Sequence, residues 1–374
     1  YSFWQYRQTV SARVPVSRLW RMNARAIALG TSGISPLGIG PVCILGTGLI
    51  GGSLMRDLAA RGVSVFGYTR SAADARQAVA DGFDVATSLA AALQRAESEA
   101  ALIVIAVPFN AVAEVVDAIA QFAPSCGVTD VVSVKTPVHD IIAARGMLER
   151  YVGGHPMAGT ESSGWAASHT GLFARAAWAV TYDFAADCAA RGQQVPQAWA
   201  ALFSQVCTMA GVVGAEAVPV SAGKHDEAVA RVSHLPHVVA EALAVVGDRG
   251  RTLAQSLAAG SFKGATRVAG TEPALVRNMC ETNAAPLATA LAELISLLED
   301  AHSHLTAQPP SMQHLAESGH RAYERMTART AAERESVSPV AVSSRPVMRV
   351  HPGGPGWVQQ LNQIEAIGGR IEVF

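Results

Sequence analysis

One histidine near the middle of the chain is the residue best placed to do chemistry. His155 follows Gly153 and Gly154 and precedes Pro156, directly after the apolar pair Tyr151–Val152. If that pair is a strand, the glycines present the imidazole at the carboxyl edge of a sheet, where ligands bind in open α/β folds. An imidazole can take up or release a proton near neutral pH. The position therefore favours a functional role for His155 over a structural one.

A second chemical signal is the glycine pattern G-x-G-x-x-G at residues 46–51. An apolar stretch at 42–45 precedes it and a helical pattern follows, which is the context that a dinucleotide-binding loop requires. The glycines permit a tight turn, close approach of a pyrophosphate and close packing of helix on strand. Free N–H groups at the helix start favour phosphate binding. We predict that the nicotinamide cofactor is bound by Gly46, Gly48, Leu49, Ile50 and Gly51, with Val107 and Pro108 at the end of a later strand.

The residues that follow the second strand bear on which cofactor is used. An NAD site usually has an acid there for the ribose 2′-hydroxyl, but this chain has Thr69, Arg70 and Ser71 and no acid before Asp74. A hydroxyl beside a guanidinium suits a 2′-phosphate. The pattern favours NADP. NAD stays open, because Arg70 could equally be a solvated surface charge.

Strand and helix patterns alternate through the first half of the chain. The run 102–107 is continuously apolar, as is typical of a parallel strand buried on both faces. Alternation of this kind predicts a doubly wound Rossmann sheet over residues 41–195. The expected strands are 42–45, 63–68, 102–107, 131–134, 151–152 and 178–182, and the expected helices are 54–60, 72–81 and 112–122.

From about residue 196 the pattern becomes helical and rich in Ala and Leu, over 196–210, 222–246, 252–257 and 272–305. This predicts an all-α domain over 196–334, and we expect it to form a homodimer interface. Residues 335–346 resemble a linker. Residues 347–374 suggest two strands flanking a helix, a short βαβ-like tail that is too small for a complete regulatory domain.

The bulk composition narrows the class of protein. The 374 residues suggest two domains plus tails, and a net charge of −1 gives no basis for binding nucleic acid or an acidic membrane surface. Five scattered cysteines without a C-x-x-C pair indicate a reduced, cytoplasmic protein with no metal site. The sequence contains no run of 18 uncharged apolar residues, so we predict no membrane span. The arginine-rich residues 1–40 suggest a disordered extension, or else a transit peptide.

Four motifs together resemble the prephenate/arogenate dehydrogenase family, and most closely its actinobacterial members. They are residues 153–164 around His155, 130–135, 232–237 and 260–267, in the family's order, and the resemblance covers about residues 41 to 330. It implies oxidative decarboxylation of prephenate to 4-hydroxyphenylpyruvate, with hydride transfer to NAD(P)⁺. Arogenate, which would give tyrosine, is the alternative substrate, and prephenate is favoured on overall resemblance.

The resemblance also implies a role for each motif residue. His155 would accept the proton of the substrate's ring hydroxyl, and Ser133 would hydrogen-bond nearby. Because His155 must then be neutral, activity should fall as pH drops through the histidine range. Lys135 would hold a cofactor or substrate carboxylate, or be a strand-end surface charge. The substrate pocket would be lined by Ser233, His234, His237, Arg267 and Thr160.

Three further points qualify this interpretation. Pro236 lies between Ser233 and His237 and should kink the helix that carries them. Val276 stands where certain relatives have an aromatic residue. Two other functions share the glycine loop. A hydroxyacid dehydrogenase would lack the motifs around His155 and His237, and a non-catalytic NADP-sensing protein would not need His155, Ser133 and Arg267 together.

Overall fold

The structure is a computed structural model that describes residues 38–160, 162–334 and 345–374. Nearly all of the expected N-terminal extension and of the expected linker lie outside the described residues.

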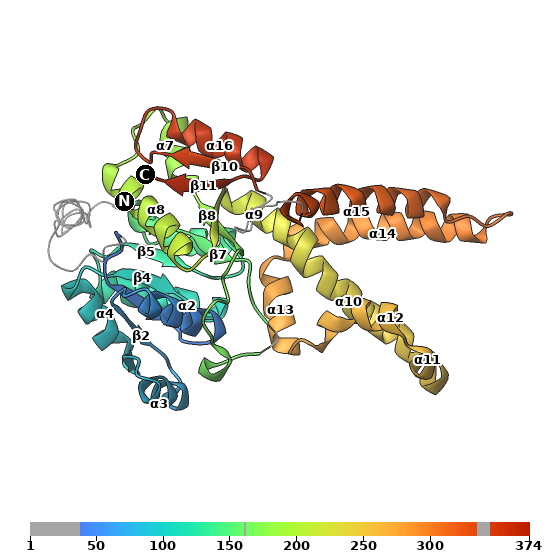
Figure 1. Ribbon diagram of the computed structural model, residues 1–374, viewed down its shortest axis with the longest axis horizontal. Coiled ribbons are helices and arrows are strands. Elements are labelled where there is room, and N and C mark those ends of the chain that lie inside the picture. The colour runs from blue at the N-terminus through green and yellow to red at the C-terminus, as the bar shows by residue number, and fades with distance from the viewer. Residues whose placement is uncertain (1–37, 161, 335–344) are drawn as a thin grey trace, which may run out of the picture.

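A six-stranded parallel sheet forms the first half of the chain, in the order β3-β2-β1-β4-β5-β6. This is the strand order of a Rossmann fold and confirms the predicted doubly wound sheet. Helices alternate with the strands along the chain (Figure 1). The elements are β1 (Val42–Leu45), α2 (Leu49–Ala60), β2 (Val65–Tyr68), α3 (Ala72–Ala80), β3 (Val85–Ala86), α4 (Leu89–Ser98), β4 (Leu102–Ile105), α5 (Val112–Phe122), β5 (Val128–Asp130), α6 (Thr136–Ala143) and β6 (Tyr151–Val152).

The strand expected at 131–134 is wrong, because β5 ends at Asp130. The Asp130 carboxylate accepts a hydrogen bond from the Val132 N–H at 2.8 Å, which satisfies that donor outside the sheet. Val131, Val132 and Val134 are buried in the loop that follows. Burial, rather than sheet pairing, therefore accounts for the apolar run.

A second, three-stranded sheet lies beside the first, and two of its strands were not predicted. It consists of β7 (Gly154–Pro156), β8 (Ala177–Thr181) and β9 (Glu216–Val220), with β7 antiparallel to β8 and β8 parallel to β9. Two helices, α7 (Asp183–Ala190) and α8 (Gln197–Val212), connect β8 to β9.

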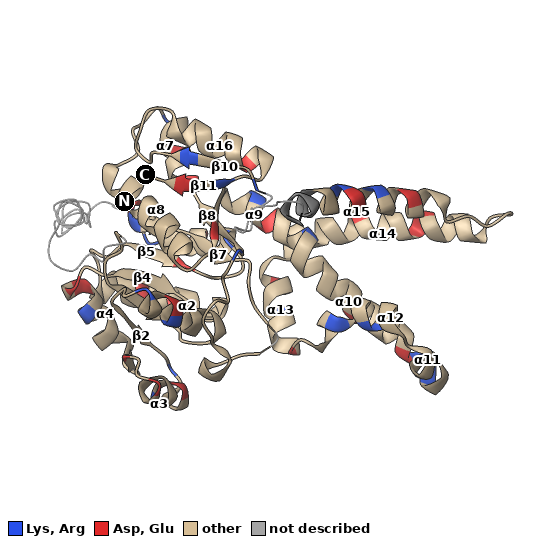
Figure 2. Ribbon diagram, viewed as in Figure 1, with Lys and Arg blue, Asp and Glu red and all other residues tan. Residues whose placement is uncertain are grey.

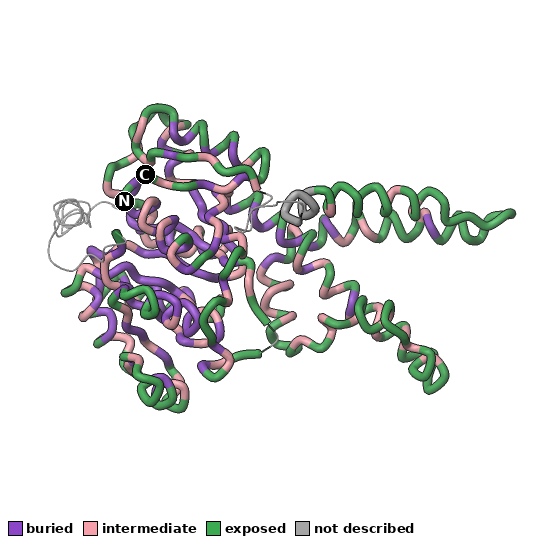
Figure 3. The backbone as a smooth tube through the Cα atoms, viewed as in Figure 1, coloured by how far each residue is buried: buried purple, intermediate pink, exposed green. Residues whose placement is uncertain are grey.

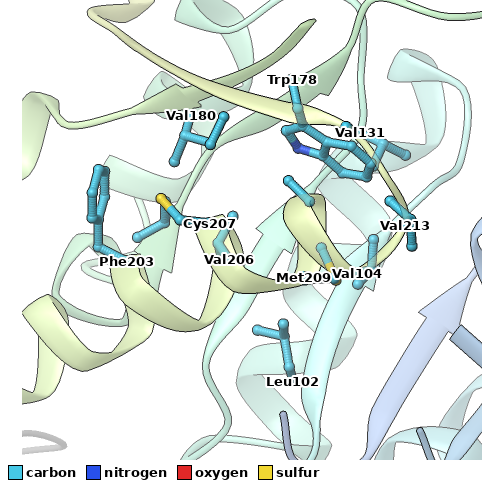
Figure 4. Packing of buried hydrophobic residues seen from close by; sticks show 14 of the residues in the cluster. Leu102, Val104, Val131, Trp178, Val180, Phe203, Val206, Cys207, Met209 and Val213 are labelled. Atoms are coloured by element: carbon cyan, nitrogen blue, oxygen red, sulfur yellow. The ribbon is translucent and has the colours of Figure 1, made fainter. Parts of the chain in front are cut away.

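The helical domain begins later than residue 196. Figure 4 shows Phe203, Val206 and Met209 of α8 among residues of β4 and β8. Because α8 and β9 complete the core between the two sheets, the predicted boundary at 196 does not match the packing. The helices that leave this core start at α9 (Ala222–Val229).

Two helical arms project from the body of the molecule (Figure 1). Their residues are mostly exposed, whereas buried residues are concentrated in the body (Figure 3). Figure 2 shows few charged residues along α10, while α15 carries both signs. After α9 the arms consist of the π-turn η4 (Ala230–His234), α10 (Leu235–Asp248), α11 (Arg251–Leu257), α12 (Gly260–Ala265), η5 (Arg267–Gly270), α13 (Pro273–Thr282), α14 (Ala284–Thr306) and α15 (Gln313–Arg334).

The continuous helical stretch Ala222–Asp248 is long and apolar enough to cross a membrane by length and composition alone. It is the one such stretch in the part of the chain that the structure describes. Its first turns carry the buried polar pair His225 and Asp226, which contact the body of the protein. We therefore assign its apolar surface to packing between helices.

The C-terminal module (residues 345–374) is a parallel βαβ unit, as the sequence predicts. It comprises β10 (Val347–Val350), α16 (Trp357–Ile367) and β11 (Arg370–Val373). The Trp357 ring packs on α8, with its centroid 5.6 Å from that of Phe203 and 6.2 Å from that of Trp199. The module is therefore part of the body of the molecule rather than a free tail.

Candidate active site

The glycine loop between β1 and α2 has the geometry of a dinucleotide site. Gly46 has φ +106°, and a Cβ there would lie 2.4 Å from the Ala106 carbonyl oxygen. A Cβ on Gly51 would lie 1.9 Å from the carbonyl oxygen of Gly46. By contrast, a Cβ on Gly48 would meet nothing within 4 Å. Two of the glycines are thus required by packing, while Gly48 leaves open space in front of the loop.

Local polar groups fit a pyrophosphate in that space. Helix α2 starts at Leu49 and Ile50 with no side-chain cap, so its first N–H groups are available to an anion. The Thr47 hydroxyl is buried and has no hydrogen-bond partner among the described residues. Val107 borders the loop, since its Cγ1 would lie 3.1 Å from a Cβ on Gly46, and Pro108 follows it.

The segment after β2 contains one cation, Arg70, that has no ion pair among the described residues. Thr69 is buried and its hydroxyl accepts a hydrogen bond from the Ser71 N–H at 3.4 Å. The Ser71 hydroxyl caps α3 by accepting from the Asp74 N–H at 3.1 Å. Arg70 is exposed and makes no ion pair within the described residues. Arg70 is therefore the charge in this segment that an additional phosphate could engage.

His155 lies directly beyond β6, as expected, but it does so within strand β7 of the second sheet. It pairs with Ala179 of β8. The glycines before it allow this close approach, because a Cβ on Gly153 would lie 2.7 Å from the Thr181 hydroxyl and one on Gly154 2.6 Å from the Asp130 carbonyl oxygen. Larger residues there would displace the strand that carries His155.

A chain of hydrogen bonds behind His155 is the central feature of the site. Nδ1 of His155 lies 2.8 Å from Nε2 of His225, and Nδ1 of His225 lies 2.8 Å from Oδ1 of Asp226. The Asp226 carboxylate also accepts from the N–H groups of Lys135 at 2.7 Å and Thr136 at 2.8 Å. We call the pair His225 and Asp226, which lies behind His155, the relay.

Sequence reasoning missed His225 and Asp226. Their contact with His155 spans 70 residues of chain, so no local pattern reveals it. The local signal is a histidine next to an aspartate, six to seven residues before the motif at 232–237.

The relay determines which nitrogen of His155 is free. Burial raises the pKa of Asp226, but hydrogen bonds from His225, Lys135 and Thr136 outweigh it and lower the pKa, so the carboxylate is charged. Nδ1 of His225 must then donate to Asp226, which leaves Nε2 of His225 to accept from Nδ1 of His155. Nε2 of His155 is consequently an acceptor facing away from the relay.

Burial also keeps the imidazoles neutral. Burial, followed by the charges of His225, Lys135 and His234, holds the pKa of His155 well below its usual value of 6.5. Burial likewise lowers the pKa of His225, and it lowers the pKa of His234 to about 4. The site therefore holds an unprotonated His155 at neutral pH, as a proton acceptor requires.

Lys135 has neither of the two roles considered for it. Its ammonium group is buried, pairs with the Asp130 carboxylate and donates to the Gly154 carbonyl oxygen at 2.6 Å. The Tyr151 hydroxyl donates to the same carboxylate at 2.6 Å. Lys135 is thus neither a surface charge nor a ligand for cofactor or substrate, and it fixes the backbone next to His155.

The motif at 232–237 lies where a turn of π-helix joins α9 to α10, and the kink expected at Pro236 stays a prediction. Residues 230–234 form a turn of π-helix, which accommodates the missing N–H of Pro236 and is frequent at functional sites. Nδ1 of His237 is buried without a partner among the described residues, and Ser233 is half-buried. A polar ligand could satisfy His237.

His234 differs from its neighbours in the motif. Its side chain is buried and its Nδ1 lies 3.1 Å from Nδ2 of Asn283, which also donates to the Asp226 carbonyl oxygen at 2.8 Å. The structure thus places His234 within the wall of the site. Its direct contact with substrate stays a prediction.

The remaining predicted residues are not joined to His155 by hydrogen bonds within the described part of the chain. Ser133 is half-buried in the loop after β5, Arg267 is exposed at the start of η5, and Thr160 is exposed beside the undescribed residue 161. Their roles stay predictions. The described residues also contain no group of three or more His, Cys, Asp or Glu that could hold a metal ion.

Two family models match the chain. The model described as prephenate dehydrogenase, nucleotide-binding domain, matches residues 54–201, and prephenate dehydrogenase, dimerization domain, matches residues 221–317. The second model starts at α9, in agreement with the packing. These matches confirm the resemblance drawn from the four motifs.

Comparisons with individual proteins point to the same family. A crystal structure from Corynebacterium glutamicum, provisionally assigned as a prephenate dehydrogenase, has 53% identity and a TM-score of 0.82, covering 89% of this chain and 99% of that one. The Zymomonas mobilis cyclohexadienyl dehydrogenase is 29% identical over 74% of this chain and 93% of its own. The Lactococcus lactis prephenate dehydrogenase is 29% identical over 47% of each, so the chain spans about half the length of that relative.

Proposed function

This chain belongs to the prephenate dehydrogenase family, and we propose that it catalyses the oxidative decarboxylation of prephenate to 4-hydroxyphenylpyruvate. The observation that carries the proposal is an unprotonated His155 whose Nε2 is left free by the relay, on the strand that directly follows the dinucleotide-binding sheet.

Proton transfer is the step that the chain's own residues perform. When bound, the nicotinamide cofactor would supply the hydride acceptor for the ring carbon that bears the hydroxyl. Nε2 of His155 takes the hydroxyl proton as that carbon–oxygen bond gains carbonyl character. When CO₂ leaves, the electron pair of the broken carbon–carbon bond stays in the ring and makes it aromatic. His155 then returns the proton to the ring oxygen, which becomes the phenol hydroxyl. One hydride and one CO₂ leave per turnover, and His155 ends as it began.

The relay stabilises His155 while it carries the proton. As His155 becomes a cation, its Nδ1–H strengthens its hydrogen bond to His225, and the Asp226 carboxylate at the far end opposes the new charge. The arrangement extends the logic of a Ser-His-Asp triad by one imidazole.

We propose that the substrate is bound by residues of the long helix and of the loops around His155. His237 has a buried nitrogen without a partner among the described residues, and Ser233 lies in the π-helical turn just before it. We propose that Arg267 and Thr160, both exposed, contact the substrate's carboxylates, for which a guanidinium fork is suited. We propose that Ser133 contacts the ring hydroxyl beside His155.

We propose that the nicotinamide cofactor is NADP in preference to NAD, with Thr69, Arg70 and Ser71 around its 2′-phosphate. The support is the exposed Arg70 without an ion pair in the described residues and the missing acid after β2. A charged hydrogen bond is worth about 1.5–3 kcal/mol. Arg70→Ala should therefore raise the KM for NADP roughly 10- to 100-fold and leave that for NAD nearly unchanged. Equal effects on both cofactors would contradict the assignment.

We propose that two copies of the chain associate through the arms as a homodimer. Large apolar residues on them are exposed in the single chain, such as Val246 at 60%, Leu297 at 47% and Leu298 at 54%. Covering these side chains with a second copy would remove their apolar surface from water, which is favourable.

A cytoplasmic location stays a prediction.

The function is tested by initial rates with prephenate or arogenate, each with NAD or NADP, followed by nicotinamide absorbance. We expect the highest kcat/KM with prephenate and NADP, with 4-hydroxyphenylpyruvate as the product. A higher value with arogenate would reassign the substrate. A folded, cofactor-binding protein that turns over none of the four pairs would overturn the proposed activity and favour a sensing role.

A further inference from the structure

The start of helix α9 is held by residues that are distant in the chain. Ser221 precedes the helix, and its side chain caps no helical N–H. Instead, the Ser221 N–H donates to Oε1 of Glu365 at 2.7 Å, and the Ala222 N–H donates to the Asp183 carboxylate at 3.1 Å. Glu365 lies 144 residues later, on α16 of the C-terminal module.

Glu365 is fully engaged at this position. Its Oε1 also accepts from the Ser221 hydroxyl at 3.1 Å, and its Oε2 accepts from the Tyr182 hydroxyl at 2.9 Å and from the Lys224 ammonium at 2.5 Å. The side chain is only 6% exposed. A carboxylate at a helix N-terminus is favourable because it opposes the positive end of the helix dipole.

Packing fixes where Glu365 lies. Its neighbour Ile364 is fully buried, and Trp357 of the same helix packs on Trp199 and Phe203 of α8. Figure 1 shows α16 docked on the body of the molecule rather than on the arms. The carboxylate is therefore a fixed point from which α9 is held.

The relay lies one turn further along α9. His225 and Asp226 follow Ser221 by four and five residues, and each bond of the relay spans 2.8 Å. A catalytic constellation tolerates errors of only about 0.5 Å. A shift of the first turn of α9 would therefore move His225 out of hydrogen-bonding distance of His155.

We propose that Glu365 is a positioning residue of the active site, through which the C-terminal module holds α9 and the relay in register with His155. This inference rests on the proposed function, because a displaced relay is detected as a change in the kcat of the proposed reaction. In this role the C-terminal module supports catalysis through Glu365 and does not need to bind a ligand.

The test compares Glu365→Gln with the control Glu372→Gln. Glu372 lies on β11 of the same module, is 48% exposed and pairs only with Arg349 and Arg370 among the described residues. We expect Glu365→Gln to lower kcat about 10- to 100-fold, as loss of an orienting contact typically does. The affinity for NADPH, measured by its nicotinamide fluorescence, should not change. Glu372→Gln should match wild type.

The pH profile separates positioning from general destabilisation. His155 faces His225 and Asp226 of α9, Lys135 of the loop after β5 and His234 of η4. Release of α9 relieves the burial of His155 and moves His225 away. The acid limb of kcat/KM should consequently shift toward pH 6.5 in Glu365→Gln and stay in place in Glu372→Gln.

Amide hydrogen exchange gives a readout that does not depend on activity. In Glu365→Gln the amides of 222–229 should exchange faster, while those of β1 and β4 keep their protection. Tyr182→Phe, which removes one donor to Glu365, should act in the same direction but less, and it serves if Glu365→Gln does not fold.

Two outcomes distinguish the claims. An active wild type with kcat, pH profile and exchange all unchanged in Glu365→Gln would overturn this inference alone. A wild type that is inactive with all four substrate and cofactor pairs would overturn the proposed function. In that case unchanged exchange over 222–229 would still count against the role of Glu365.

Discussion

At the scale of single residues, the chemistry depends on Nε2 of His155. Its free lone pair follows from the order of hydrogen bonds through His225 to Asp226. Position and protonation are thus set together, because the contacts that hold the ring also choose its tautomer. A histidine on an open strand would have neither property.

The pH dependence follows from the lowered pKa of His155. A proton acceptor is active when unprotonated, so a pKa below 6.5 extends activity to lower pH than an ordinary histidine would. The sequence predicts a fall through the histidine range, and the structure moves that fall below pH 6.5. We expect log kcat/KM to be level from pH 8 to 6.5 and to fall below it. An acid limb centred at or above pH 6.5 would contradict this, provided that NADP affinity stays constant.

Asp226 sets the tautomers of the relay. In Asp226→Asn an amide replaces the charged acceptor, so His225 is no longer obliged to donate from Nδ1 and His155 loses its stabilising charge. We expect kcat to fall at least about 100-fold, within the range of general base catalysis. Glu227→Gln, at the exposed neighbouring position, is the control. Equal kcat in the two variants would remove Asp226 from the mechanism.

At the scale of elements, the glycine loop and the strand that carries His155 are positioned by close packing. The buried ion pair of Lys135 and Asp130 joins β5 to β7, since Lys135 also donates to the Gly154 carbonyl oxygen. Tyr151 completes the set from β6. The edge of the Rossmann sheet is thereby tied to the strand of the second sheet on which His155 lies.

Loss of Lys135 should be costly for stability. Lys135→Met leaves the buried Asp130 charge without its partner, and such changes cost about 3–5 kcal/mol. Denaturant unfolding should show a lower free energy of unfolding, with partial recovery in Lys135→Met/Asp130→Asn. Lys263→Met, at an exposed lysine, is the control. A change below about 1 kcal/mol, as for a surface ion pair, would show that the pair is not structural.

Local sequence was sufficient for some elements and not for others. The glycine loop, α5 and the position of His155 are encoded by neighbouring residues, and they were predicted closely. β9 was missed because its five residues lie between long apolar helices and its partner, β8, comes 35 or more residues earlier. The relay and the Lys135 pair were missed for the same reason: their partners come from other elements, and no single stretch contains both halves.

At the scale of the whole molecule, a compact body carries two mostly exposed arms (Figure 3). The body holds both sheets, α8 and the C-terminal module, while the arms begin at the helix that carries the relay. Helix α9 therefore joins the proposed catalytic site to the proposed dimer interface.

The homodimer predicts a measurable mass. Light scattering should give about twice the 38.9 kDa of the chain. Leu298→Glu places a charge on an α14 position that is 54% exposed in the single chain, and burying it against a second copy would be unfavourable. We expect this variant to run as a monomer, whereas Glu299→Gln beside it should stay dimeric. A wild type at the mass of one chain would rule out the proposed interface.

The kcat of His155→Asn tests whether His155 is the proton acceptor in prephenate oxidation. Asparagine keeps the polarity and approximate size of the side chain but cannot take up the proton. We expect kcat to fall about 10²- to 10⁴-fold, while the binding of NADPH, measured by its nicotinamide fluorescence, stays unchanged. A kcat within a few-fold of wild type would contradict it and require another residue to accept the proton.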